Sequence, residues 1–291
     1  MLHVNLLFVL RYTVNTMKKW TIALMGTFTH LCLGTVYAWS FFQTPITELS
    51  GWSNARVAWA FSLSIFMLGV TAAWGGTKMT RFGPRRLAMI GGVLYALGYI
   101  VSSFALKTLN LPLLYVGFGI IGGIGLGLAY VTPVATVSRW FTEKQGLATG
   151  MVVMGFGFGA LVMSKILAPL FLEMTNGELS RCFLYIGLLL LILLPLFASF
   201  LHLPKTENTV SEEKSVARVF DYILAKPFII LWLMFLINVI AGMVFISFQS
   251  PLLQDLLKAG MPTGTDFSDT ALIHSLSAAG GTLIAVSSVF N

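Results

Sequence analysis

Four apolar stretches of the chain carry polar or aromatic side chains every three or four residues, which places those side chains on one face of a helix. Their imidazole, hydroxyl, indole and amide groups can hydrogen-bond a polar solute or a neighbouring helix. Polar groups find no hydrogen-bond partners in lipid tails. Four polar helix faces in one bundle therefore favour a central polar path over dry contacts between helices. The faces comprise Thr27, His30, Gly34, Tyr37 and Phe41; Trp59, Ser62, Phe66 and Gly69; Asn238, Gly242, Phe245 and Gln249; and His274, Ser277, Gly281 and Ser288.

Ionisable side chains are rare within these stretches, and no Asp or Glu falls inside them. Intramembrane ionisable groups usually mark solute or proton pathways. His30 fits either a packing residue hydrogen-bonded across helices or a residue that faces a ligand. Lys165 lies about two turns from one end of its stretch, where its ammonium group can either reach the lipid headgroups or attract an anion.

Eight apolar runs of about 20 residues must position these side chains. Hydrophobic residues make up 57% of the chain and charged residues 10%, against about 25% charged in soluble domains. This composition excludes a soluble enzyme and a disordered protein, and the unbroken runs exclude a β-barrel. The sequence predicts an all-α polytopic membrane protein. Its runs are Trp20–Phe42, Val57–Thr77, Leu87–Leu106, Leu111–Val137, Leu147–Leu172, Cys182–Leu203, Pro227–Gln249 and Ala271–Phe290.

The polar stretch 204–226 is the one clear change of composition along the chain. We interpret it as a cytoplasmic linker between a bundle of six helices, residues 18–203, and a partial second bundle, residues 227–291. Residues 1–17 are an N-terminal extension, because the apolar segment near the start is too short to span a membrane. Met17 is an alternative start of the chain.

The distribution of Lys and Arg predicts the orientation of the bundle. With a cytoplasmic N-terminus, 13 of the 18 basic residues fall on the inner side and four on the outer side, and Lys165 lies in a span. Cytoplasmic loops carry such an excess, so we expect a multi-pass protein of the cell membrane, plasma or inner, with its N-terminus inside. The net charge of +7 is thereby explained without a nucleic-acid partner.

Glycine is concentrated in the fourth and fifth runs, where Gly119, Gly123 and Gly127 form one face and Gly155 and Gly159 another. These small faces allow close helix contact. No strand precedes them, so they do not form a phosphate-binding loop. The sequence contains no catalytic or metal-ligand motif, and Cys32 and Cys182 fall in apolar runs as small hydrophobic residues. We therefore expect no enzyme activity, cofactor or metal.

The connection after the second run resembles the signature loop of the major facilitator superfamily, Gly-x-x-x-Asp-Arg-x-Gly-Arg-Arg. It reads Gly76-Thr-Lys-Met-Thr-Arg-Phe-Gly-Pro-Arg-Arg86, with Gly76, Arg81, Gly83 and Arg85 at matching positions, Pro84 at the first of the two final Arg positions and Arg86 directly after them. Thr80 stands at the acidic position, which weakens the expectation of the usual charge relay in this loop. The resemblance implies that the loop takes part in gating.

Further segments narrow the resemblance to the oxalate/formate antiporter family. They are Gly34–Ser40, Phe82–Arg85, Gly123–Tyr130, Arg139–Gly150 and Gly155–Gly159. The family implies two six-helix bundles with the substrate site between them at mid-membrane, and its aromatic site residues in helices one and four correspond to Tyr37 and Tyr130. Its decisive cations belong to the second half, so the chain resembles a carrier cut short inside helix eight.

The resemblance leads us to predict a monomeric secondary transporter of small organic anions, such as oxalate, formate or other monocarboxylates including pyruvate. It works by alternating access and exchange. We expect substrate contacts from Tyr37, Tyr130, His30, Trp59 and Asn238, because a carboxylate in a low-dielectric cavity needs hydrogen-bond donors. Two alternatives stay open. The chain is a non-transporting fragment of such a carrier, or it belongs to a proton-coupled monocarboxylate symporter.

Overall fold

The structure is a computed structural model of the 291-residue chain that describes residues 2–204, 225–261 and 279–284, with side chains from residue 17 onward. The described residues form helices and no strand. Three short elements, η1, η2 and η3, interrupt the α-helices: η1 is a 3₁₀ turn, and η2 and η3 are π-helices. In chain order the elements are α1 (Leu2–Gly34), η1 (Thr35–Ala38), α2 (Trp39–Ser50), α3 (Asn54–Phe82), α4 (Pro84–Lys107), α5 (Leu111–Leu114), η2 (Tyr115–Gly122), α6 (Gly123–Trp140), α7 (Gln145–Val162), η3 (Met163–Leu167), α8 (Ala168–Met174), α9 (Leu179–Ala198) and α11 (Lys226–Ala259).

Seven helical stretches of the described residues are long and apolar enough to cross a membrane. They correspond in order to the first seven predicted runs, and the eighth run lies outside the described residues except for positions 279–284. The predicted all-α polytopic fold is confirmed. The stretches are Met17–Ser50, Asn54–Phe82, Pro84–Lys107, Leu111–Trp140, Gln145–Met174, Leu179–Ala198 and Lys226–Ala259.

The predicted ends of several helices were wrong. The first stretch continues to Ser50 and the seventh to Ala259, beyond the predicted ends at Phe42 and Gln249. Both continuations are polar enough to interrupt an apolar run, yet their backbone stays helical. The helix α1 starts at Leu2, so the expected extension is continuous with the first span. The predicted linker lies almost entirely outside the described residues.

Turn residues explain where the helices stop. Gly51 and Gly83 adopt φ values of 70° and 77°, a region that favours glycine, and each donates its N–H to the carbonyl four residues earlier at 2.9 Å. Pro84 then occupies the first turn of α4, where a missing N–H costs nothing. At the other end of the bundle, the Asn110 side chain caps α5 by accepting the N–H of Leu113 at 3.0 Å.

Glycines set the closest helix contacts, as the small-residue faces predicted. A Cβ added at Gly155 or Gly159 would collide with the α1 backbone carbonyl of Thr27 or Leu31, and one at Gly123 would lie 2.7 Å from the Ser64 carbonyl of α3. The helices α1 and α7 therefore touch backbone to backbone, and so do α3 and α6. Substituting any of these glycines requires the two helices to separate.

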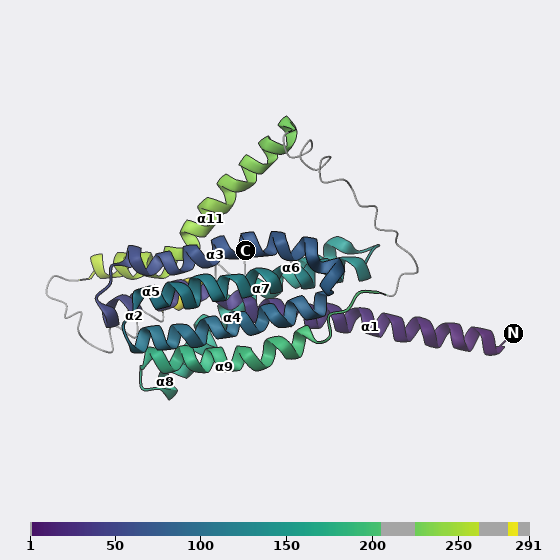
Figure 1. Ribbon diagram of the computed structural model, residues 1–291, viewed down its shortest axis with the longest axis horizontal. Helices are drawn as coiled ribbons and strands as arrows, with labels where there is room; N and C mark the ends of the chain where they lie inside the picture. Colours follow the sequence, from purple (N-terminus) through teal and green to yellow (C-terminus); the bar gives the residue numbers. More distant parts are fainter. Residues whose placement is uncertain (1, 205–224, 262–278, 285–291) are drawn as a thin grey trace.

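The long helices of residues 17–198 run side by side in one bundle, as Figure 1 shows. We call the end near residues 83, 141–144 and 199–204 the loop end, and the end near residues 51–53, 108–110 and 175–178 the far end. In Figure 1, α11 lies along α2 and α3 at the far end and diverges from the bundle towards the loop end. Its buried side chains all fall in its second half: Ser247, Gln249, Ser250, Pro251 and Gln254.

Candidate functional site

Three membrane spans bring four aromatic rings together inside the bundle. His30 of α1, Tyr37 of η1 and Tyr130 of α6 surround Phe156 of α7. The Phe156 ring centroid lies 4.7 Å from that of Tyr37, 5.3 Å from that of Tyr130 and 5.8 Å from that of His30, each in an edge-to-face arrangement. This geometry is favourable for aromatic pairs. We call these four residues the aromatic site.

His30 belongs to the wall of the aromatic site. It is fully buried, its Nε2 lies 2.9 Å from the Tyr130 carbonyl oxygen, and its ring stacks on the Tyr130 ring at 4.9 Å. Both interactions hold α6 and the Tyr130 ring in place. His30 therefore positions Tyr130 from behind, which is the packing role among the two that the sequence allowed.

The two tyrosines differ from His30 because both are only partly buried. Among the described residues, no side chain or backbone group hydrogen-bonds the hydroxyl of Tyr37 or Tyr130. A phenol hydroxyl can donate one hydrogen bond. The aromatic site thus presents two hydroxyl donors next to an apolar ring, which suits a small solute with acceptor oxygens.

The aromatic site lies near mid-membrane. At 1.5 Å per residue, its four members lie within about 7 Å of the midpoints of their own spans. The hydrocarbon core extends about 15 Å to each side of its centre. A polar solute held here is well inside the bilayer, where hydrogen-bond donors have little competition from water.

A local break in the first span directs Tyr37 into the site. Gly34 packs so tightly against the Phe156 backbone that a Cβ would overlap its carbonyl, and the chain then forms the 3₁₀ turn η1. Thr35 anchors this turn, because its Oγ1 donates to the Cys32 carbonyl at 2.7 Å and lies 3.0 Å from the Tyr95 hydroxyl oxygen. The turn is thus fixed directly before Tyr37.

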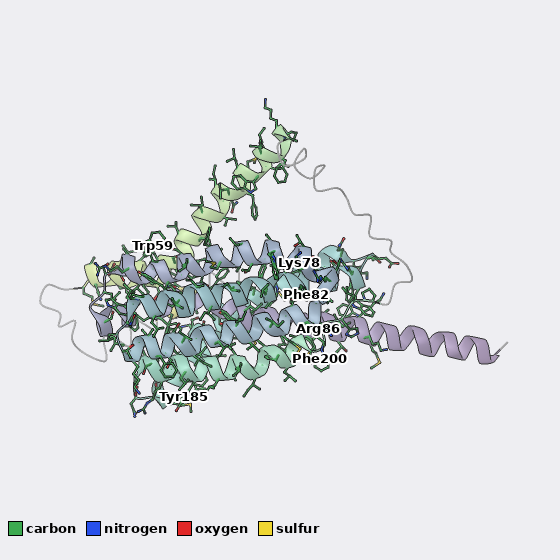
Figure 2. The ribbon with its side chains drawn as sticks, viewed as in Figure 1. Trp59, Lys78, Phe82, Arg86, Tyr185 and Phe200 are labelled. Carbon is green, nitrogen blue, oxygen red and sulfur yellow. The ribbon has the colours of Figure 1, made fainter. Side chains whose placement is uncertain are left out.

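Trp59 and Asn238 lie elsewhere. Figure 2 shows Trp59 on the outside of α3, where 65% of its surface is exposed. Asn238 is exposed on the part of α11 that diverges from the bundle. The structure therefore brings together His30, Tyr37 and Tyr130 but leaves Trp59 and Asn238 apart from them.

Phe156 is the site residue that sequence reasoning missed. It lies in the string Gly155–Gly159, which we interpreted as a helix-packing face and as part of the family resemblance, without assigning Phe156 to the site. The same string contains Phe158, which is 38% exposed, whereas Phe156 is 4% exposed. A bulky ring between two glycines on a close-packed face was the available signal, because such a ring must insert between the neighbouring helices.

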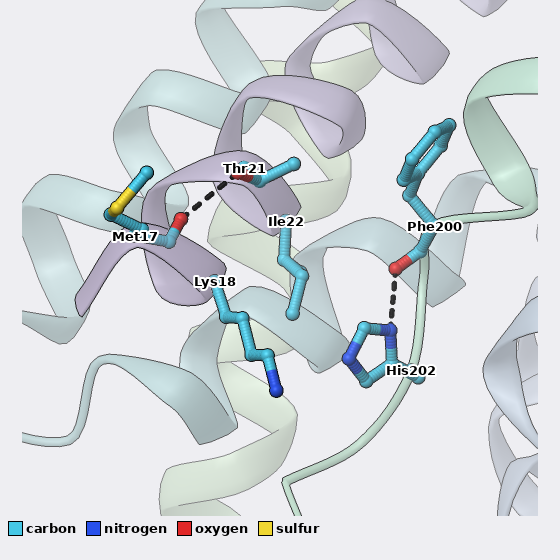
Figure 3. Close-up of a pocket in the computed structure, with 6 residues that line it drawn as sticks. All are labelled: Met17, Lys18, Thr21, Ile22, Phe200 and His202. Atoms are coloured by element: carbon cyan, nitrogen blue, oxygen red, sulfur yellow. Dashed lines mark hydrogen bonds between the residues drawn. The ribbon is translucent and has the colours of Figure 1, made fainter. Parts of the chain in front are cut away.

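A pocket opens at the loop end, separate from the aromatic site, as Figure 3 shows. It has a volume of about 360 Å³ and is lined by Met17, Lys18, Thr21, Ile22, Phe200 and His202. Thr21 donates to the Met17 carbonyl at 2.9 Å, and His202 Nδ1 lies 2.8 Å from the Phe200 carbonyl oxygen. Two of its polar groups are therefore engaged with the local backbone, and the remaining lining is largely apolar.

The family profile of the Major Facilitator Superfamily matches residues 22–290. The chain belongs to this superfamily. A crystal structure of a D-xylose-proton symporter has the same fold, with a TM-score of 0.59 and 17% identity over 90% of this chain and 66% of that one. The predicted family and multi-pass membrane fold are both confirmed.

The relatives of this major facilitator are transporters. The oxalate:formate antiporter of Oxalobacter formigenes is 28% identical over 79% of this chain and 54% of its own length. An uncharacterized transporter of Escherichia coli, YhjX, is 28% identical over 89% of this chain and 64% of its own length. Human monocarboxylate transporter 14 is 32% identical over 53% of this chain and 30% of its own length. These relatives are transport proteins and not enzymes, as predicted, and the chain spans less than two thirds of their lengths.

In this major facilitator the loop between α3 and α4 matches the predicted signature. Gly76 lies in the last turns of α3, and Gly83 forms the turn into α4. Arg81, Arg85 and Arg86 are exposed around that turn, and Figure 2 shows Lys78, Phe82 and Arg86 gathered at the loop end. The Arg81 guanidinium lies 5.7 Å from the Phe82 ring centroid. These cations are therefore accessible to other helices or to anionic headgroups.

Proposed function

We propose that this major facilitator carries small carboxylates, such as oxalate, formate or other monocarboxylates, across the cell membrane by alternating access. The aromatic site binds the anion, and the Tyr37 and Tyr130 hydroxyls donate to its carboxylate oxygens. The single observation that carries the proposal is the pair of hydroxyls near mid-membrane that have no hydrogen-bond partner among the described residues, held on a buried Phe156. The oxalate:formate antiporter and monocarboxylate transporter names of the relatives support this class of substrate.

Buried polar atoms support a hydrated route from the aromatic site towards the far end. Within the described part of the chain, Trp39 Nε1, Ser40 Oγ, Gln43 Oε1 and Ser64 Oγ are buried without a hydrogen-bond partner. Leaving such groups unsatisfied is costly, so a polar occupant is favoured there. They lie on α2 and α3, and three of them follow Tyr37 along the chain.

The arrangement of α11 supports alternating access. In Figure 1 the bundle and α11 are close at the far end and apart at the loop end. We propose that the loop end is the side from which a solute reaches the aromatic site in this arrangement. Rocking of the halves about the mid-membrane site would reverse this asymmetry. The excess of Lys and Arg on the loop side of the chain supports a cytoplasmic loop end.

Exchange is favoured over proton symport by the distribution of acids. None of the predicted apolar runs contains Asp or Glu, and a carboxylate at depth is a common proton carrier in transporters. We therefore expect the loaded site to cross more readily than the empty one. Labelled anion should enter vesicles preloaded with unlabelled anion faster than empty vesicles, at equal pH on both sides.

The proposal is tested with Tyr130→Phe in proteoliposomes that contain this chain. Losing one hydrogen bond to a charged group costs about 1.5–3 kcal/mol, so KM for labelled oxalate or formate should rise about 10- to 100-fold. Tyr185→Phe is the matched control, because Tyr185 is exposed on α9 and packs only against the edge of the bundle at Phe171.

If Tyr130→Phe takes up labelled anion as the wild type does, with the same inhibition by unlabelled anion, Tyr130 does not bind the substrate. Absence of uptake of every carboxylate by the folded wild-type chain would reject the proposed function itself. Folding is checked separately, by elution of the detergent-solubilised protein as a single species.

A further inference from the structure

Lys165 is unusual among the charged residues of this protein because it lies deep in a span. It is nine residues from Met174, the nearer end of its span, whereas every other Lys, Arg, Asp or Glu in the seven described spans lies within four residues of an end. At 1.5 Å per residue it is about 8 Å from the midpoint of the span, on the far side. A charge at this depth is costly and usually functional.

Lys165 contacts the second half of the chain. Its Nζ donates to the Oγ1 of Thr282, in the helical segment 279–284. Next to it, Ser164 Oγ donates to the Gly281 carbonyl at 3.4 Å. A Cβ added at Gly280 would collide with Ser250 of α11. These contacts join α7–η3, segment 279–284 and α11 at the far end, and we call them the far-end contact.

The far-end contact must separate for a solute to reach the aromatic site from the far side. The buried side chains of α11 lie in its second half, and its first half diverges from the bundle. Among the described residues, contact between the halves is thus concentrated at the far end, where α11 packs against α2 and Thr282 meets Lys165. The Lys165 and Thr282 side chains are exposed in this arrangement, and when the halves part the Lys165 ammonium loses the Thr282 hydroxyl.

A carboxylate is a better partner for this ammonium than a threonine hydroxyl. Hydrogen bonds between two ionised groups are shorter and about twice as strong as those between neutral groups, and low polarity strengthens them further. Lys165 follows Phe156 by nine residues, or about 13 Å along the helix, on the far side. A carboxylate that enters from the far side would therefore meet Lys165 before it reaches Phe156.

We propose that Lys165 binds the carboxylate of a solute that enters from the far side. In the arrangement seen here its ammonium donates to Thr282, and a carboxylate takes the place of that hydroxyl when the far-end contact opens. The proposal rests on the proposed function for its ligand. It assigns the first contact of an anion entering from the far side to Lys165 and the second to Tyr37 and Tyr130. The site selects for a carboxylate before the solute reaches mid-membrane.

The transport test measures KM for labelled oxalate or formate from each side, in membrane vesicles of known and opposite orientation. Lys165→Gln should raise KM from the far side about tenfold and change KM from the loop side by less than threefold. Lys165→Arg should restore most of the loss. The control is Lys107→Gln, which removes an exposed cation at the far end of α4 and should leave both constants unchanged.

The contact itself is tested without any substrate. In a Cys32→Ala/Cys182→Ala background, Ser164→Cys with Gly281→Cys should be joined by a short bifunctional thiol reagent, because a Cβ at Gly281 lies 3.2 Å from the Ser164 carbonyl oxygen. The control pair, Gly150→Cys with Gly281→Cys, should not cross-link, since Gly150 is 14 residues away from Ser164 along the same span.

The two arms separate the possible failures. Absence of the Ser164–Gly281 cross-link, or equal change of both KM values in Lys165→Gln, overturns the proposal. A lysine that only anchors the helix at the headgroups would give no sided change in KM. If the cross-link forms but the wild-type chain transports no carboxylate, the proposed function fails and the carboxylate assignment of Lys165 fails with it, while the far-end contact stands.

Discussion

Replacing Gly34 by alanine tests whether the aromatic site depends on backbone contact between α1 and α7. The added methyl group would overlap the carbonyl of Phe156, and a backbone atom cannot rotate away as a side chain can. The helices must therefore separate near the site. Overpacking of this kind costs about 1–3 kcal/mol, which corresponds to a fall of about 2–5 °C in Tm for a chain of this size.

The same displacement moves Phe156, on which both tyrosines rest, so Gly34→Ala should also weaken carboxylate binding. The assay is thermal unfolding of the detergent-solubilised protein, followed by uptake in proteoliposomes. Gly150→Ala is the control: it lies on α7, and a Cβ there would meet no atom within 4 Å. If Gly34→Ala unfolds at the same temperature as Gly150→Ala, the backbone contact does not have the closeness that we describe.

Two further substitutions test the site and the loop. Phe156→Ala should lower Tm and raise KM for the anion, because it empties a buried position between the tyrosines. Phe158→Ala, which removes the exposed ring two residues away, should do neither, and equal effects would contradict the role of Phe156. Gly83→Ala should cost about 1–3 kcal/mol in unfolding free energy, because φ of 77° with ψ of 151° is a backbone conformation essentially confined to glycine. Gly76→Ala is the control with ordinary contacts, and an equally stable Gly83→Ala would refute the strain.

The glycine faces show how much of the packing the sequence could predict. Spacing alone put Gly155 and Gly159 on one side of a helix, and both meet the backbone of α1. A small residue in a span has few other uses, since lipid-facing positions gain nothing from lacking a side chain. The partner helix was not predictable, because a small face specifies close approach without specifying what approaches.

Trp59 and Asn238 mark the limit of reading helical faces. Their spacing correctly places them on helices, but periodicity does not say which face points inward when the solvent is hydrocarbon. Tryptophan is enriched at membrane interfaces, and Trp59 lies near the far end of α3 with most of its surface exposed. Asn238 lies on the diverging part of α11, where its neighbours depend on how the halves are arranged.

Departures from α-helical geometry occur where we place solute contacts. Tyr37 lies in the 3₁₀ turn η1 and Lys165 in the π-helix η3. Short π segments within α-helices are frequently found at functional sites. An extra residue in a turn rotates everything after it by about 100° relative to a regular helix of 3.6 residues per turn. Regular spacing of about 3.6 residues per turn therefore assigns the residues after η3 to the wrong side of the helix. For the same reason, spacing alone does not predict that Lys165 contacts Thr282. The backbone irregularity itself thus helps to set the direction of these two side chains.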